Sequence, residues 1–461
     1  MNTKQRDPYF ASRGWNIIQA AVEYFISILV GTTYLAKLCL DIGISDSITG
    51  VLNAFISLGF GFQFFALFIS GRTGGSKRIV TLLAVVNQAA FSFLYLIPVF
   101  DISKNAKTAI FVVLLLLAEV VKNIAFPLQS TWFISLVDDK KRGVFIAKKE
   151  IISLISGMIV SMIMGRVIDS FEAKGELRTA FIIGGITLFA LTAIHTALLI
   201  MIKEKPQDKQ AKPPKVKLML KDTFSDKNLL LLIPLFIFWN MAVYSTVPFY
   251  ATYQINELGF TMTFVAVQGI VYAVTRSLIS IPIGKLADKY SFTTMLTVCY
   301  SIAAMGYVLA VFMKPGNGHV LYTLYHALYA MSMAGINGGS SNLVYDYVPY
   351  SRRTGSLAVK NTFAGFAGFL TTLAFSPLID KIQKANNTFM GMENVYAQQV
   401  VSVFGLVMVL VCIAYLNIVI KPLHKPADHL PPLDPEEIAK DDIPKSAITP
   451  EQVPVETQAE V

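Results

Sequence analysis

The sequence predicts an all-α polytopic membrane protein in which twelve transmembrane helices form two pseudo-symmetric six-helix halves. Of its 461 residues, 54% are hydrophobic and only 15% are charged, and the mean hydropathy is +0.56. A soluble chain of this length would carry roughly a quarter of charged residues. A stretch at 137–157 also recurs at 348–368. An apolar composition with a repeat near half the chain length is typical of membrane proteins built from two related halves.

The repeat keeps one register over its whole length. VDDKKRGVFIAKKEIISLISG aligns with VPYSRRTGSLAVKNTFAGFAG, and each residue lies 211 positions from its counterpart. Arg142 matches Arg353, and Lys149 matches Lys360. In both copies an apolar segment ends, a short basic turn follows, and an apolar segment rich in small residues begins. The register therefore pairs the fourth expected span with the tenth.

Apolar segments long enough to cross a bilayer follow one another along the chain. A spanning helix needs about 20 mostly apolar residues. The expected spans are 15–37, 48–70, 79–99, 108–137, 145–169, 179–202, 229–255, 261–284, 292–313, 319–346, 356–379 and 396–420. They divide the chain into an N-terminal half (1–202), a cytoplasmic linker (203–228), a C-terminal half (229–420) and a tail (421–461).

The linker and the tail are polar. The linker is rich in Pro and Lys, so we expect a solvated connector with an amphipathic stretch near residues 216–220 on the inner membrane surface. The tail combines prolines and acidic residues with few large apolar side chains. It cannot bury enough surface to fold, and we expect it to be disordered.

Lys and Arg lie mainly on one side of this topology. With the N-terminus inside, the inner segments carry 24 of them and the outer turns carry nine. The positive-inside rule therefore predicts a multi-pass protein of the cell membrane with both termini in the cytoplasm. The formal net charge is +9, but the basic residues are spread over separate turns. This pattern excludes a continuous nucleic-acid-binding patch.

The cysteines indicate neither a disulfide framework nor a metal site. Cys39, Cys299 and Cys412 lie far apart in apolar segments, without the Cys or His spacing of a zinc site. The sequence therefore predicts no cofactor and no metal. The expected partners are the lipid bilayer, a small-molecule substrate and a coupling ion, and we expect a monomer.

Two expected inner turns carry related motifs, GRTGGSKR at 71–78 and GKLADK at 284–289. Both resemble the loop signature of the major facilitator superfamily, roughly G-x-L-A-D-R-x-G-R-K. RG at 142–143 and RTG at 353–355 are similar to the basic turn that this superfamily places after spans four and ten. Together with twelve spans and a long central loop, the resemblance covers residues 10–420.

The resemblance implies a cytoplasmic gate at these turns. In the family the acidic residue of the loop pairs with basic groups and a helix N-terminus, which steadies the outward-open state. The second loop keeps Asp288, whereas the first has Gly75 near the acidic position. The gate candidates are Arg72, Lys77, Arg78, Arg142, Gly284, Lys285, Asp288, Lys289 and Arg353. The alternative for the basic residues is that they only set the membrane topology.

A charge deep in a span costs several kcal/mol unless it meets a cavity or a partner, about 3 kcal/mol on insertion scales. Span four holds Glu119 and Lys122, which lie at i and i+3 on one helical face and can pair. Asn123 follows them. This group is a candidate for substrate binding or proton coupling. The alternative is a self-satisfied pair that packs against span one or two.

The other polar candidates lie on spans one, seven, eight and ten, and the resemblance implies that spans one, four, seven and ten line a cavity. Gln268, Tyr272 and Arg276 form a stripe down one face of span eight. In span seven Pro248 predicts a kink. The candidates are Glu23, Tyr24, Asn240, Tyr244, Tyr250, Gln268, Tyr272, Arg276, His326 and Asn337.

Each of these candidates also has a structural alternative. For the tyrosines and His326 the alternative is core packing, and for Glu23 and Arg276 it is snorkelling to the interface. Asn337 begins an Asn-Gly-Gly sequence that we expect to interrupt span ten. His195 in span six has no polar neighbour in the sequence and is not assigned to a site.

The predicted function is secondary active transport of a small solute by alternating access, coupled to protons. The inventory of one midplane acid, two cations and many Tyr and Asn suits a sugar, a nucleoside or a small organic anion. A drug-type efflux antiporter is the alternative within transport. A non-transporting sensor and a membrane-embedded enzyme are alternatives from other classes, although no HExxH or GxSxG motif supports an enzyme.

Overall fold

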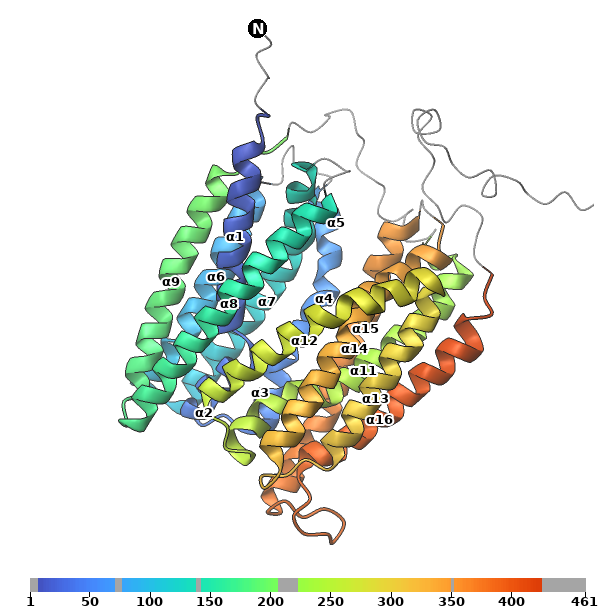
Figure 1. Cartoon of the computed structure of the whole chain (residues 1–461). Helices are drawn as coiled ribbons and strands as arrows, with labels where there is room; N and C mark the ends of the chain where they lie inside the picture. The colour runs from blue at the N-terminus through green and yellow to red at the C-terminus, as the bar shows by residue number, and fades with distance from the viewer. Residues whose placement is uncertain (1–6, 71–76, 138–141, 206–222, 350–351, 425–461) are drawn as a thin grey trace, which may run out of the picture.

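The computed structural model describes residues 7–70, 77–137, 142–205, 223–349 and 352–424. These residues form helices and no β-sheet. The helices gather into two bundles that stand side by side in Figure 1. The expected amphipathic stretch of the linker and the tail beyond residue 424 lie outside the described residues.

The N-terminal bundle contains the chain up to the linker. Its helices are α1 (Phe10–Leu29), α2 (Thr32–Ile42), α3 (Asp46–Asn53), α4 (Phe55–Phe60), α5 (Phe65–Ser70), α6 (Lys77–Leu94), α7 (Lys104–Ser135), α8 (Arg142–Ala173) and α9 (Leu177–Met201), with the 3-10 turns η1 (Gly61–Phe64) and η2 (Ile97–Val99). We call the end of the molecule at which α1 begins the N-terminal end and the other end the distal end.

The C-terminal bundle contains the chain after the linker. Its helices are α11 (Lys227–Thr252), α12 (Met262–Lys289), α13 (Phe292–Val311), α14 (Gly318–Tyr347), α15 (Arg353–Lys384) and α16 (Ala397–Tyr415), and the π-helical turns η4 (Tyr253–Glu257) and η6 (Leu416–Ile420) extend α11 and α16.

Ten helical segments of the described chain are long and apolar enough to cross a membrane. The other two expected spans, 48–70 and 319–346, correspond to residues 46–70 and to α14. Residues 46–70 break into α3, α4, η1 and α5, and α14 is rich in Tyr, Ser and Asn. Both traverse the molecule in Figure 1, so the architecture is compatible with twelve crossings.

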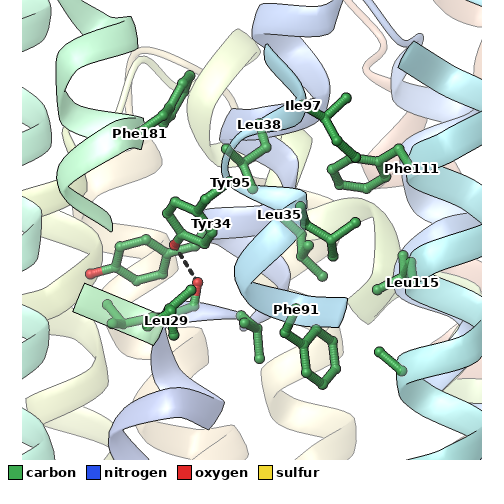
Figure 2. Close-up of a cluster of buried hydrophobic side chains, with 14 of the residues drawn as sticks. Leu29, Tyr34, Leu35, Leu38, Phe91, Tyr95, Ile97, Phe111, Leu115 and Phe181 are labelled. Atoms are coloured by element: carbon green, nitrogen blue, oxygen red, sulfur yellow. Dashed lines mark hydrogen bonds between the residues drawn. The ribbon is translucent and has the colours of Figure 1, made fainter. Parts of the chain in front are cut away.

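The first span is also broken, between α1 and α2. The helix ends at Leu29, where its last carbonyl groups lose their intrahelical partners. The hydroxyl of Tyr95, the residue after α6, donates a hydrogen bond to the Leu29 carbonyl, as the dashed line in Figure 2 marks. Around this contact the side chains of α1, α2, α6, α7 and α9 form the main apolar core of the bundle.

The repeat predicted from the sequence appears as a pair of equivalent helices. α8 and α15 are each 32 residues long and begin 211 residues apart, at Arg142 and Arg353. A tyrosine ring packs against the equivalent glycine of each helix. A Cβ atom added at Gly157 would lie 2.3 Å from the ring of Tyr24 in α1, and one added at Gly368 would lie 2.6 Å from the ring of Tyr244 in α11. Small residues allow this close helix packing in both halves.

Two boundary expectations are wrong. The motif at 284–289 forms the last turns of α12, which continues to Lys289, and does not form a turn after it. α14 also continues through Asn337, Gly338 and Gly339 without interruption. A Cβ at Gly339 would lie 2.4 Å from Met295 of α13, so this glycine serves the contact between α13 and α14 and does not break the helix.

Hydrogen bonds between the two bundles gather from the middle of the molecule to the distal end. Asp169 of α8 accepts hydrogen bonds from the backbone N–H groups of Met262 and Thr263, both at 2.8 Å. Five further bonds join Asp46 to Asn256 and Gln383, the Ser47 carbonyl to Ser376, Asn53 to the Pro248 carbonyl, and Ser57 to the Gly365 carbonyl, and a longer bond from Asn361 to Gln63 lies outside this set. We call this set the distal contact.

Pro248 lies inside α11 and lacks the N–H group that would bond the carbonyl of Tyr244 four residues earlier. The hydroxyl of Thr372 in α15 donates to that carbonyl at 2.6 Å. A neighbouring helix thus supplies the partner that the proline removes, as the bilayer interior requires.

We expect Thr372→Val to destabilise the protein by about 1 kcal/mol, because the Tyr244 carbonyl loses its donor in an apolar environment. Thr371→Val is the matched control, since the Thr371 hydroxyl bonds only the Ala367 carbonyl of its own helix. Thermal unfolding of the purified variants in detergent measures the difference. Equal unfolding temperatures for the two variants would contradict this role of Thr372.

Candidate functional site

A cavity of about 640 Å³ lies between the two bundles at mid-height, and we call it the central cavity. It is lined by Thr32, Asn53, Ile56, Phe60, Gln63, Phe126, Phe236, Trp239, Asn240, Val243, Tyr244, Val247, Pro248, Tyr329, Met333, Ile336, Asn337, Ser340, Ser341, Lys360, Asn361 and Ala364. The distal contact closes it on one side. Its lining residues Phe126 and Asn337, which lie nearer the N-terminal end, are exposed.

Three predicted residues, Asn240, Tyr244 and Asn337, line the central cavity. The amide of Asn240 donates to the Phe236 carbonyl at 2.9 Å, which leaves its amide oxygen for a ligand. The ring of Tyr244 packs against Gly368, so that its position depends on the absence of a side chain there. Aromatic faces and amides of this kind can hold a small polar solute.

A second cavity of about 240 Å³ continues from the first toward the distal end, and the two share Thr32, Val247 and Tyr329. The predicted residues Tyr250, Gln268 and His326 line it. Gln268 donates to Thr323 at 2.9 Å. The His326 ring stacks on Tyr322 and lies against Tyr272, with ring centroids 5.3 Å apart in each case. We call this space the distal chamber.

Arg276 and Tyr24 lie beside these cavities. Tyr24 lines a third space of about 220 Å³ between α1, α2, α8 and α12, which shares Thr32, Thr33, Val265 and Gly269 with the distal chamber. Arg276 lies one turn along α12 from Tyr272, and it lines none of the three spaces described above.

Glu119, Lys122 and Asn123 do not line the central cavity. Glu119 is only 2% exposed, and Lys122 Nζ lies 3.4 Å from both of its carboxylate oxygens. Asn123 packs against Gly59 of α4. The geometry matches the alternative given above, in which Glu119 and Lys122 pair with each other and pack against span one or two. The neighbouring helix is α4, which belongs to span two.

A chain of amides links this pair to the cavity wall. Asn361 of α15 donates to Gln63 of η1 at 3.4 Å, and Gln63 donates to Asn123 at 3.1 Å. Asn123 in turn donates to the Glu119 carbonyl at 2.9 Å. Asn361 and Gln63 belong to different bundles and both line the central cavity, so a ligand there can act on the Glu119 helix through this chain.

A buried polar network that the sequence did not reveal lies inside the N-terminal bundle. His195 of α9 is fully buried, and its two ring nitrogens lie 2.7 Å from Gln19 and 3.0 Å from Gln88. Gln19 and Gln129 both donate to the carboxylate of Glu23, each at 2.7 Å. Four helices thus meet around Glu23. The sequence pattern that could have indicated this network is the presence of three glutamines in apolar spans, with Gln19 and Glu23 at i and i+4.

The position of Lys360 in the central cavity is a second feature that the sequence did not reveal. The expected span 356–379 begins only four residues before Lys360, but α15 begins seven residues before it and carries it into the central cavity. Its exposure is 8%, and its Nζ lies 4.6 Å from the ring centroid of Phe236. The signal was its position inside an expected span.

The gate candidates lie at the N-terminal end and do not form one site among the described residues. Lys77 donates to the Ile200 carbonyl at 2.6 Å, and Arg353 donates to the Tyr345 carbonyl at 2.6 Å, both within their own bundles. Arg72 lies outside the described residues, and only the backbone of Arg142 is described. The remaining candidates, Arg78, Gly284, Lys285, Asp288 and Lys289, are exposed.

Known proteins with a similar fold are found by comparison of both the sequence and the structure. A family model described as Major Facilitator Superfamily matches residues 15–372. Among solved structures, the nucleoside transporter NupG has a TM-score of 0.66 at 14% identity, over 88% of this chain and 98% of that chain. A D-xylose-proton symporter has a TM-score of 0.67 at 15% identity, over 88% and 97%.

The xylose transporter XylE from E. coli, solved in an inward open conformation, has a TM-score of 0.62 at 12% identity, over 88% of this chain and 95% of that chain. At such identities the likeness shows the fold alone. A search of curated proteins by sequence finds no significant match.

We expect His195→Leu to destabilise the protein by roughly 1–3 kcal/mol, because the buried amides of Gln19 and Gln88 lose their partner. His326→Phe is the matched control: His326 makes ring contacts in the distal chamber, and a phenyl ring preserves them. Thermal unfolding in detergent compares the two. A His195→Leu protein as stable as His326→Phe would show that the network contributes nothing to stability.

Proposed function

The chain belongs to the major facilitator superfamily, and from this premise we propose that it is a secondary active transporter that moves a small polar solute across the cell membrane by alternating access. The observation that carries the proposal is the central cavity, which lies at mid-height between the bundles, with the distal contact on one side of it. Transport folds of this kind place the substrate at the interface of their repeats.

The distal contact is the part of the structure that must break for the cavity to open on the other side. Asp169 bonds the first N–H groups of α12, where the helix dipole favours a negative charge. Asp46 bonds Asn256 and Gln383 at 2.7 and 2.8 Å. With both termini in the cytoplasm, as the distribution of basic residues predicts, this state is open to the cytoplasm.

The exposed gate candidates acquire a role in the opposite state. Asp288 ends α12 at the N-terminal end, with Lys285 and Lys289 beside it. When the bundles close there, Asp288 can meet the basic residues that precede α6, as the family loop implies. Asp169 and Asp288, at opposite ends of α12, then stabilise opposite states.

For proton coupling we propose Glu23, with Glu119 as the alternative. Lys122 already neutralises Glu119, whereas the described ion pairs include none for Glu23, which accepts only amide hydrogen bonds. A proton that arrives at Glu23 would weaken both bonds and loosen α1 from α7. His195, joined to Gln19, belongs to the same network.

We expect Asp169→Ala to favour opening at the distal end and Asp288→Asn to oppose it. Loss of an N-terminal cap costs about 1 kcal/mol, which changes the ratio of the two states roughly fivefold. A Ser341→Cys reporter in the central cavity, with a membrane-impermeant thiol reagent on the distal side, measures this ratio. The native cysteines are buried and supply little background.

Asp380→Ala is the matched control, because Asp380 occupies the repeat position of Asp169 but pairs with Lys384 on its own helix at 2.6 Å. Its labelling rate should equal that of the parent protein. If Asp169→Ala labels no faster than Asp380→Ala, the distal contact does not hold the state described here.

A thermal-shift screen against metabolite classes identifies the solute, and proteoliposomes with an imposed proton gradient then measure its accumulation. We expect Glu23→Gln to abolish accumulation but to retain exchange of solute across the membrane, because the neutral amide mimics the protonated acid. Glu119→Gln should retain both. The reverse result would assign the coupling to Glu119, and accumulation by both variants would argue against proton coupling.

A further inference from the structure

Lys360 is a buried cation on the wall of the central cavity. It lies two turns into α15, next to Asn361 and across from Phe236 of α11. Its exposure is 8%, and the same wall contributes Asn240, Asn337 and hydroxyl groups. The ammonium group is therefore removed from solvent but adjoins the space in which a ligand would lie.

The charge of Lys360 has no counter-ion in the described part of the chain. The lining of the central cavity contains no Asp, Glu or Arg and no second Lys. The described ion pairs do not include Lys360, and its one recorded contact of this kind is with the Phe236 ring at 4.6 Å. A cation–π contact attracts the ammonium group to the ring but supplies no negative charge to neutralise it.

Two other lysines within the membrane-spanning helices each have an acidic partner. Lys37, which is 6% exposed, lies 2.5 Å from Glu172, and Lys122 lies 3.4 Å from Glu119. Lys149, the repeat counterpart of Lys360 in α8, is only half-buried and does not line the central cavity. The unpaired cation is therefore a feature of the cavity and not of the repeat.

We propose that Lys360 binds the anionic group of the substrate, which is a small organic anion, either a carboxylate or a phosphate monoester. This inference rests on the proposed transport function and narrows its substrate class. The anion supplies the missing counter-ion, and a charge-assisted hydrogen bond in a water-poor site is strong. The amides of Asn240 and Asn337 on the cavity wall are then available to the polar remainder, and Trp239 and Phe236 to its apolar part.

The test measures thermal unfolding of the purified full chain with matched pairs of solutes that fit the cavity: gluconate against glucose, nicotinate against nicotinamide, and glucose 6-phosphate against glucose. We expect at least one acid to raise the unfolding temperature more than its neutral partner, and its class identifies a carboxylate or a phosphate site. Lys360→Met should lower the affinity for that acid at least tenfold, and Lys360→Arg should retain part of it.

Lys149→Met is the control, and it should bind the acid like the parent protein. A Lys360→Met protein that binds the acid unchanged, or a parent protein that prefers no acid in the panel, would overturn the inference. Flux of the same solutes in proteoliposomes separates the two proposals. Transport of neutral solutes alone refutes the anion site but keeps the transporter, whereas acid binding through Lys360 without flux keeps the site and refutes transport.

Discussion

The arrangement of polar groups in this protein depends on one constraint: hydrocarbon offers no hydrogen-bond partners, so each buried donor or acceptor must find one within the protein. Thr372 bonds the carbonyl that Pro248 leaves free, and Tyr95 bonds the carbonyl at the end of α1. Glu23 receives two amide groups from two helices. The bonds of Thr372, Tyr95 and Gln129 fix how neighbouring helices are placed, because each reaches a group on another helix.

The two halves share a backbone pattern, but equivalent residues make different contacts in each half. α8 and α15 begin 211 residues apart and receive a tyrosine ring over the same glycine position. Yet Asp169 bonds the other bundle while Asp380 bonds its own helix, and Lys360 lines the cavity while Lys149 does not. Pseudo-symmetry therefore supplies two similar scaffolds, and the same residue type at equivalent positions forms a contact or a cavity wall in only one of them, because its neighbours differ.

Sequence patterns predicted the fold class and the cavity residues Asn240, Tyr244 and Asn337, because hydropathy and the repeat register assign residues to helices with few alternatives. They did not predict the His195 network, whose members are brought together from positions 107 and 176 residues apart. The position of Lys360 in the cavity was not predicted, because a lysine near the end of an apolar segment has the same sequence pattern whether it faces water or a cavity. Hydropathy also does not encode which neighbour packs against the face of α7 that carries Glu119, and in the structure that neighbour is α4.

The bond between Asp169 and α12 uses backbone donors, and this has a practical consequence. The N–H groups of Met262 and Thr263 are present whatever side chains follow them, so the contact is controlled from α8 alone. Position 263 can therefore carry a spectroscopic probe that leaves the interaction beside it intact. A distance from such a probe to a second one on α8 would follow the separation of the bundles in real time, in a membrane and during turnover.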